Sequence, residues 1–126
     1  VADRVILTGT CSPEEVAVLL KQAAVFSLAS SHFDNQPMVF LEAAASGLPI
    51  VYCDERMTEC LTERNAILTD GIEGEDFARV FASLLSDDAR LAALSEGALE
   101  VAEQFDSETM TRRLINLYED LLVSYR

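Results

Sequence analysis

The sequence has few of the residues from which metal sites and disulfide frameworks are built. It contains three cysteines, Cys11, Cys53 and Cys60, and a single histidine, His32. No two cysteines form a C-x-x-C pair, and an odd, widely spaced set does not indicate a disulfide framework. Structural zinc sites draw four ligands from Cys and His. We therefore expect free thiols, no metal site and a reducing, cytoplasmic setting. Peripheral association of the parent protein with a membrane is left open.

Basic charge is also scarce. The 126 residues include 9 Lys and Arg against 22 Asp and Glu, a net charge of -13. A chain so acidic is a poor partner for nucleic acid and for anionic membrane surfaces. No signal peptide and no apolar run long enough to cross a bilayer is present. The length suits one domain, residues 1–126, and the start at Val1, without a Met, leads us to expect a partial domain from a larger protein.

Short apolar runs alternate with helical patterns along the first part of the chain. We expect strands at 4–8, 24–29, 50–53 and 66–69, and one or two helical turns at 57–63. A helix capped by Ser12, with Pro13 first and Glu15 three residues after the cap, follows the first run. A second helix covers 37–46 and ends at Gly47. Three helices follow residue 71, the last capped by Asp106 or Ser107 and long.

This order predicts an α/β fold: a three-layer, Rossmann-like parallel sheet with helices on both faces and a long C-terminal helix. In such sheets ligands bind beyond the carboxyl ends of the strands. The loops at 9–12, 30–36 and 54–58 each follow a predicted strand. We expect them to share one edge, where Gly9, Ser31 and His32 are candidates for ligand contact.

Glu42 is the only ionisable side chain between Asp34 and Asp54, and its helix is otherwise apolar. We expect that helix to be largely buried, where a lone carboxylate is costly unless it is paired or hydrogen-bonded. The start of the helix near Pro37 offers unpaired backbone amides and the positive end of a dipole, which suit a phosphate. Glu42 leans toward that end and could accept hydrogen bonds from sugar hydroxyls. The alternative is that Glu42 is a structural acid.

Other single residues support weaker hypotheses. Cys11, in the loop after the first run, suggests a thiol phosphocarrier, although no arginine or glycine-rich loop follows it. His32 is better placed for ligand contact than for general base catalysis. Gly9 does not belong to a G-x-G-x-x-G fingerprint. We treat Arg56 and Arg64 as surface residues.

The stretch D-N-Q-P-M-V-F-L-E-A-A-A-S-G-L-P-I-V (34–51) resembles a known family. It is similar to the E-x7-E segment of retaining glycosyltransferases of family 4 (glycosyl transferases group 1), followed by that family's E-A-x-A-x-G-x-P-V. The segments V-I-L-T-G, S-P-E-E-V and L-L-K-Q-A-A-V-F-S-L-A-S-S before it, and L-Y-E-D-L near the end, extend the resemblance. It covers nearly the whole chain but only the later part of the nucleotide-sugar-binding domain of a GT-B enzyme.

The resemblance implies roles for individual residues. Glu42 matches the second acid, which binds the ribose hydroxyls, and Asp34 matches the first, the catalytic-site acid that contacts the transferred sugar. Asn35, Gln36, Pro37, Met38 and Val39 match the segment whose backbone approaches sugar and diphosphate. Such enzymes transfer a sugar from a nucleotide diphosphate sugar, here UDP- or GDP-linked, with retention of configuration and without a bound metal or other cofactor.

Two departures from the family pattern limit the expected activity. The first acid is Asp34 where the family usually has Glu, one methylene longer. The Arg and Lys that neutralise the diphosphate have no counterpart, and the acceptor domain is missing. Without those cations the main electrostatic stabilisation of the departing diphosphate is lost, so we expect the isolated chain to be inactive and its parent to be the enzyme.

Two further expectations remain open. The alternative function is a noncatalytic Rossmann-like module for interaction or regulation. The last helix, 107–125, is longer than a small sheet needs, so we expect it to pack partly on the missing domain. In the isolated chain the exposed surface could then support self-association.

Overall fold

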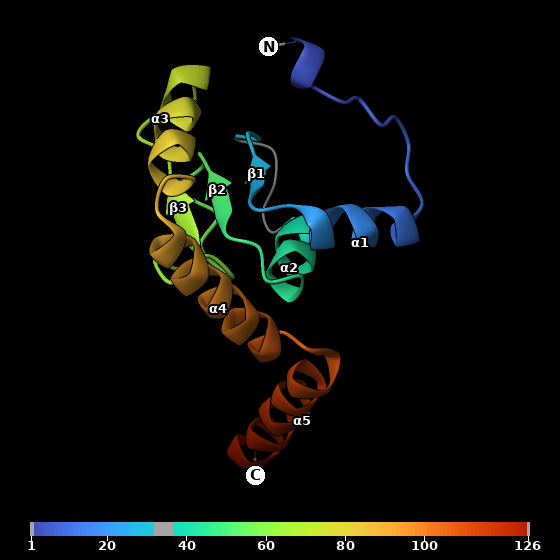
Figure 1. Ribbon diagram of the computed structural model, residues 1–126. Coiled ribbons are helices and arrows are strands. Elements are labelled where there is room, and N and C mark those ends of the chain that lie inside the picture. Colours follow the sequence, from blue (N-terminus) through green and yellow to red (C-terminus); the bar gives the residue numbers. More distant parts are fainter. Residues whose placement is uncertain (1, 32–36, 126) are drawn as a thin grey trace.

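The computed structural model describes residues 2–31 and 37–125 (Figure 1). Within them the elements are η1 (Ala2–Arg4), α1 (Pro13–Gln22), β1 (Phe26–Leu28), α2 (Met38–Ala45), β2 (Ile50–Tyr52), β3 (Ala66–Leu68), α3 (Gly74–Leu84), α4 (Asp88–Gln104) and α5 (Ser107–Ser124). The predicted strands at 24–29, 50–53 and 66–69 are confirmed, as are the helix after Ser12, the helix at 37–46 and the three helices after residue 71, with ends shifted by a few residues.

The three strands of the described residues form one parallel sheet in the order β1-β2-β3. Phe26 is paired with Ile50, and Ile50 with Ala66, so the strands start at the same level. Parallel strands in chain order require crossovers, which α2 and the 53–65 segment supply. All three strands therefore end at the same edge of the sheet.

Both faces of the sheet are covered, as predicted. Ile50 lies in a core cluster with Phe40, Ala43 and Ala44 of α2. Its neighbour Val51 lies in a second cluster with Phe77 and Leu84 of α3. Successive strand residues point to opposite faces, so α2 and α3 lie on opposite sides of β2 (Figure 1). The helix α4 contributes to both clusters: Ala98 and Val101 belong to the cluster of Ile50, and Leu94 belongs to the cluster of Val51.

The predicted strand at 4–8 is wrong. Val5, Ile6 and Leu7 are exposed by 57%, 86% and 92%, in an irregular segment between η1 and α1. Figure 1 shows this segment running apart from the sheet. A β-branched run becomes a strand only when a neighbouring strand accepts its backbone hydrogen bonds. Among the described strands, none pairs with it.

Local capping signals were reliable. Ser12 caps α1 in a full capping box: its hydroxyl accepts from the Glu15 amide, and the Glu15 carboxylate accepts from the Ser12 amide at 2.8 Å. Gly47 ends α2 with a φ of 72°, a left-handed conformation that favours glycine. Its carbonyl accepts a 2.6 Å hydrogen bond from the Ser95 hydroxyl, which ties the end of α2 to α4.

The expected helical turns at 57–63 are not present; the segment consists of turns and bends. Met57, Cys60 and Leu61 of this segment are buried. Asn65, fully buried, organises the segment instead. Its amide nitrogen donates to the Cys60 carbonyl at 3.0 Å and its oxygen accepts from the Thr62 amide at 2.8 Å. A side chain that bonds to nearby backbone in this way competes with a helix.

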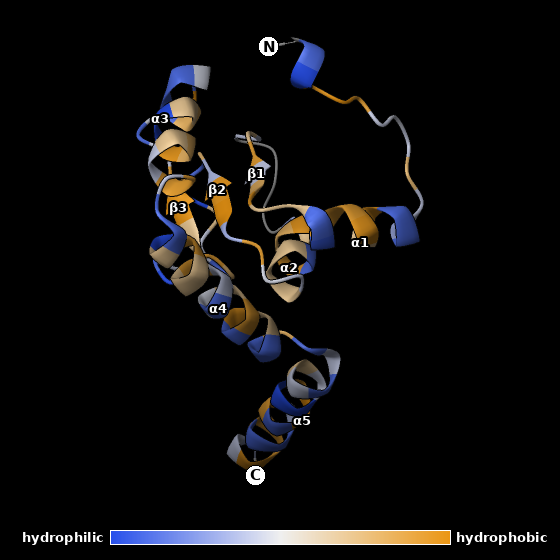
Figure 2. Cartoon of the chain, in the orientation of Figure 1, coloured by the Kyte–Doolittle hydropathy of each residue, from blue (hydrophilic) through white to orange (hydrophobic). Residues whose placement is uncertain are grey.

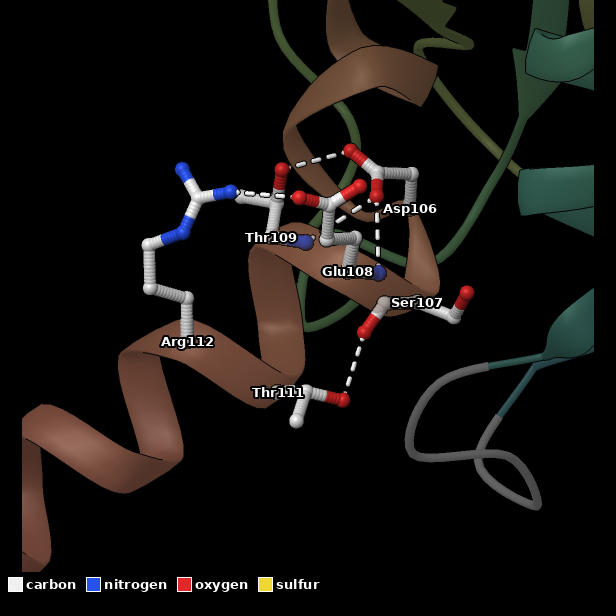
Figure 3. Close-up of polar contacts among 6 residues, drawn as sticks. All are labelled: Asp106, Ser107, Glu108, Thr109, Thr111 and Arg112. Atoms are coloured by element: carbon white, nitrogen blue, oxygen red, sulfur yellow. Dashed lines mark hydrogen bonds and ion pairs between the residues drawn. The ribbon is translucent and has the colours of Figure 1, made fainter.

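The long C-terminal helix is confirmed as α5, but it stands away from the sheet (Figure 1). None of its described side chains is buried. Asp106 caps it by accepting hydrogen bonds from the amides of Glu108 and Thr109 (Figure 3). No helix in the described part of the chain is both long and apolar enough to cross a membrane.

Candidate site at the carboxyl edge of the sheet

A hollow of about 480 Å³ opens at the carboxyl edge of the sheet. Segments that follow all three strands line it. The lining residues are Ser31 after β1, Cys53, Asp54, Glu55 and Arg56 after β2, and Leu68, Thr69, Asp70, Gly71 and Ile72 at the end of β3. The prediction that the loops 30–36 and 54–58 share one edge is thus confirmed for their described residues.

An ion pair holds the turn after β2. The buried carboxylate of Asp54 accepts from Nε of Arg56 at 2.9 Å and from Nη2 at 2.6 Å. It also accepts from the Arg56 backbone amide at 3.1 Å. The Asp54 side chain is 4% exposed and that of Arg56 is 55% exposed. The expectation that Arg56 is a surface residue is confirmed, and the structure adds that Asp54 fixes its guanidinium at the hollow.

Two other groups close this edge of the sheet. The Cys53 thiol lies 3.7 Å from the Ser30 carbonyl and links the ends of β2 and β1. Burial and, to a smaller extent, the charge of Asp54 raise the pKa of this thiol. The Thr69 hydroxyl donates to the Gly71 carbonyl at 2.6 Å. Sequence reasoning missed Asp54 and Thr69, although their positions directly after strands were a signal.

The helix α2 begins at Met38, with Pro37 as its N-cap and without a side-chain hydrogen bond to that cap. No acidic residue lies in its first turn. Proline cannot cap first-turn amides with its side chain, so the positive end of this helix is not neutralised by Pro37. Met38 and Val39 are 65% and 36% exposed. The start of the helix therefore lies at the surface, as an anion site requires.

The expectation that Glu42 is buried is wrong, because its side chain is exposed. The helix turns Phe40, Ala43 and Ala44 toward the core, and Glu42 lies on another side. There it lines a groove of about 450 Å³ between α1 and α2. The other lining residues are Cys11, Pro13, Val16, Ala17, Leu20 and Ser46. Glu42 therefore carries no desolvation penalty that needs an internal partner.

The remaining sequence candidates are dispersed. Gly9, with a φ of 66°, is exposed in the segment before α1, which does not follow a strand. The expectation that the 9–12 loop shares the carboxyl edge through such a strand is therefore wrong. Cys11 is partly buried and its thiol contacts the Gly9 carbonyl at 3.8 Å. Arg64 pairs with Glu100 on α4.

Four candidates, His32, Asp34, Asn35 and Gln36, lie outside the described residues. Their proposed roles stay predictions. Among the residues that the structure describes, no group of three or more His, Cys, Asp or Glu side chains could hold a metal ion. The described site thus consists of the carboxyl-edge hollow, which the Asp54–Arg56 pair lines, and of the start of α2, which does not line that hollow.

Comparison with known proteins places this geometry in context. The profile of a family described as glycosyl transferases group 1 matches residues 1–87. A D-inositol 3-phosphate glycosyltransferase from Corynebacterium kroppenstedtii is 30% identical over 112 residues, which cover 87% of this chain and 25% of that protein. The enzyme of the same name from Thermobispora bispora is 31% identical over 124 residues, or 97% of this chain and 29% of that protein.

Solved structures share the fold. Sucrose-phosphate synthase from Thermosynechococcus elongatus superposes with a TM-score of 0.79 at 23% identity, over 97% of this chain and 31% of that one. Anabaena HepE in complex with UDP superposes with a TM-score of 0.72 at 21% identity, over 81% of this chain and 29% of that one. The chain thus spans less than a third of each of these proteins. The GT-B type of Rossmann-like fold expected from the sequence is confirmed.

Proposed function

Because the chain belongs to the glycosyl transferases group 1 family, we propose that it is the donor-binding part of a retaining glycosyltransferase. The donor would be a nucleotide diphosphate sugar, bound at the carboxyl edge of the sheet around the start of α2. The observation that carries the proposal is the family match over residues 1–87, which includes the whole of α2 and the strands on either side of it.

The start of α2 supports this assignment. Met38 and Val39 of its first turn are exposed. Its cap residue Pro37 makes no side-chain hydrogen bond to the helix, and its first turn carries no acid. These are the properties that favour a phosphate at a helix N-terminus. Pro37, Met38 and Val39 would approach the diphosphate through their backbone. HepE, a structural neighbour, was solved with UDP, which is consistent with this class of ligand.

We assign the ribose hydroxyls to Glu42. Its exposure, which contradicts our sequence-based expectation, suits this role better than burial would, because a ligand can reach the carboxylate. A ribose presents two adjacent hydroxyls, both of which can donate to one carboxylate. Asp34 would contact the transferred sugar, and Asn35 and Gln36 would line the same approach, on the resemblance alone.

We further propose that the isolated chain does not transfer sugar. Among the described residues that line the carboxyl-edge hollow, Arg56 is the one cation, and Asp54 already engages it. Three carboxylates, Asp54, Glu55 and Asp70, line the same hollow. A departing diphosphate would find little positive charge there, and electrostatic stabilisation is usually the largest catalytic contribution. The remainder of a longer protein would supply the missing cations and the acceptor domain.

Titration of the 126-residue chain with UDP and GDP tests the proposal. Amide shifts in a ¹H–¹⁵N spectrum should concentrate at Met38, Val39 and Glu42, and Glu42→Gln should weaken binding about tenfold, the loss of one charge-assisted hydrogen bond. Glu96→Gln, an exposed acid on α4, is the matched control and should bind like wild type. Uridine and guanosine should produce the Glu42 shifts without those of the helix start.

The alternative is a noncatalytic interaction module in which Glu42 has no ligand. In that case millimolar UDP and GDP would leave the α2 amides unshifted, and Glu42→Gln would have no effect on any nucleotide. A phosphocarrier thiol at Cys11 would instead accept a phosphoryl group transferred from a phosphorylated donor, and Cys11→Ser would abolish that transfer. Either result would contradict the donor-binding assignment.

A further inference from the structure

Tyr52 is the last residue of β2, at the carboxyl end of that strand. It shares a face of the sheet with Ile50, because side chains alternate along a strand, and it packs against the core cluster on the α2 side. Figure 2 shows that β2 and α2 are both largely apolar. The tyrosine therefore brings a single hydroxyl to the end of an otherwise apolar strand.

The ring of Tyr52 is held against α2. It packs edge-to-face on Phe40, with 6.3 Å between the ring centroids and an angle of 72° between the ring planes. Phe40 is the third residue of α2, and its ring also packs on Phe26 of β1 at 6.1 Å. Aromatic pairs in this geometry are stabilised beyond the burial of their surface. Tyr52 is thus packed on a side chain from the first turn of α2, where we place the diphosphate.

The backbone of Tyr52 is fixed as well. Its carbonyl accepts hydrogen bonds from the Thr69 amide at 2.8 Å and from the Thr69 hydroxyl at 3.3 Å. These bonds tie the end of β2 to the end of β3. A group binds a ligand best when its neighbours hold it in place beforehand, since little freedom is then lost on binding.

The hydroxyl is the part of Tyr52 that the rest of the described chain leaves unengaged. None of the described residues forms a hydrogen bond with it. No buried side-chain oxygen or nitrogen among the described residues lacks a partner, so this unbonded hydroxyl reaches solvent. Burial of the ring raises the pKa of the phenol above its usual value. The hydroxyl therefore keeps its proton at neutral and mildly alkaline pH, and it can donate to an anion.

We propose that the Tyr52 hydroxyl donates a hydrogen bond to a phosphate oxygen of the bound nucleoside diphosphate. The inference rests on the proposed donor site, and it adds a donor from β2 to the amides at the start of α2. The chain is strongly acidic, and Asp54 already engages Arg56. An uncharged phenol can bind a phosphate oxygen in such surroundings without a cation, and hydrogen bonds to a charged acceptor are the stronger kind.

Removal of the hydroxyl alone tests this role in the full 126-residue chain. Tyr52→Phe keeps the ring on Phe40 and should weaken the binding of UDP and GDP about tenfold, the loss of one hydrogen bond to a charged group. The binding of uridine and guanosine should not change, because these nucleosides carry no phosphate. Glu42→Gln should in contrast weaken the nucleosides as well. Amide-shift titrations give the Kd of each pair.

Tyr118→Phe is the matched control. It removes the same hydroxyl from a residue on α5 that is 59% exposed, and it should bind UDP like the wild type. Without ligand, the amide spectrum of Tyr52→Phe should match that of the wild type beyond the immediate neighbours of residue 52. That match would show that the lost affinity does not come from a displaced α2.

Two results would overturn the assignment of Tyr52 alone. Unchanged UDP binding in Tyr52→Phe, with binding still weakened in Glu42→Gln, would mean that the hydroxyl makes no contact with the ligand. An equal loss of affinity for UDP and for uridine would mean that the hydroxyl does not act through the phosphate. A wild-type chain that binds neither UDP nor GDP would instead refute the proposed donor site, and the role of Tyr52 with it.

Discussion

The carboxylate of Asp54 accepts two hydrogen bonds from the guanidinium of Arg56, two residues further along the chain. Nε donates to Oδ1 at 2.9 Å and Nη2 donates to Oδ2 at 2.6 Å. One partner is buried and the other is half exposed. The pair is therefore neither a surface salt bridge nor a fully desolvated one. It shapes the turn after β2 and sets the charge of the carboxyl edge where we place the donor.

Replacing Asp54 should destabilise the protein. In Asp54→Ala the Arg56 amide and guanidinium lose an acceptor together, and we expect the free energy of unfolding to fall by about 1–3 kcal/mol. The exposed part of the guanidinium regains water, which keeps the loss below that of a fully buried pair. Urea denaturation measures this loss in the free energy of unfolding. The control is Arg64→Ala, whose 70% exposed side chain pairs with Glu100; its effect should be below about 1 kcal/mol. Equal effects would contradict a structural role for Asp54.

The Cys53 thiol should react slowly with iodoacetamide at mildly alkaline pH. Burial, and then the charge of Asp54, raise its pKa, so less thiolate is present than in the unfolded chain. Alkylation should rise only as the pH passes the raised pKa. Asp54→Asn removes the negative charge, lowers the pKa in part and should speed the reaction, while burial keeps it below the unfolded rate. Mass spectrometry can follow Cys53 with Cys11 as internal reference. An unchanged Cys53 rate would rule out the electrostatic contribution.

Gly97 should tolerate no side chain. A Cβ there would lie 2.0 Å from the Arg64 carbonyl oxygen, a backbone atom that cannot rotate away. Gly97→Ala should therefore push α4 away from the segment before β3 and lower the free energy of unfolding by about 1–3 kcal/mol or more. Gly74→Ala is the matched control, because nothing lies within 4 Å of its Cβ. There alanine should be neutral or slightly stabilising. Thermal unfolding of both variants compares them.

Local signals carried most of the secondary structure. The Ser12 capping box, the Gly47 helix end and the Asp106 cap each depend on residues a few positions apart, so the sequence contains all the partners. The second and third predicted strands are continuous apolar runs that pair with each other. The prediction of helical turns failed at 57–63. There one buried side chain, Asn65, takes up the backbone groups that a helix would use.

Within the described residues, tertiary structure decided what the sequence could not. Whether residues 4–8 form a strand depends on a neighbour, and none of the described strands pairs with them. Whether Glu42 is buried depends on which side of α2 faces the core, and the core takes Phe40, Ala43 and Ala44 instead. The sequence by itself determined the caps, the three paired strands with the longer helices, and the family of this chain, because these depend on short-range patterns. Exposure and pairing arise from contacts between distant segments, which only the folded chain specifies.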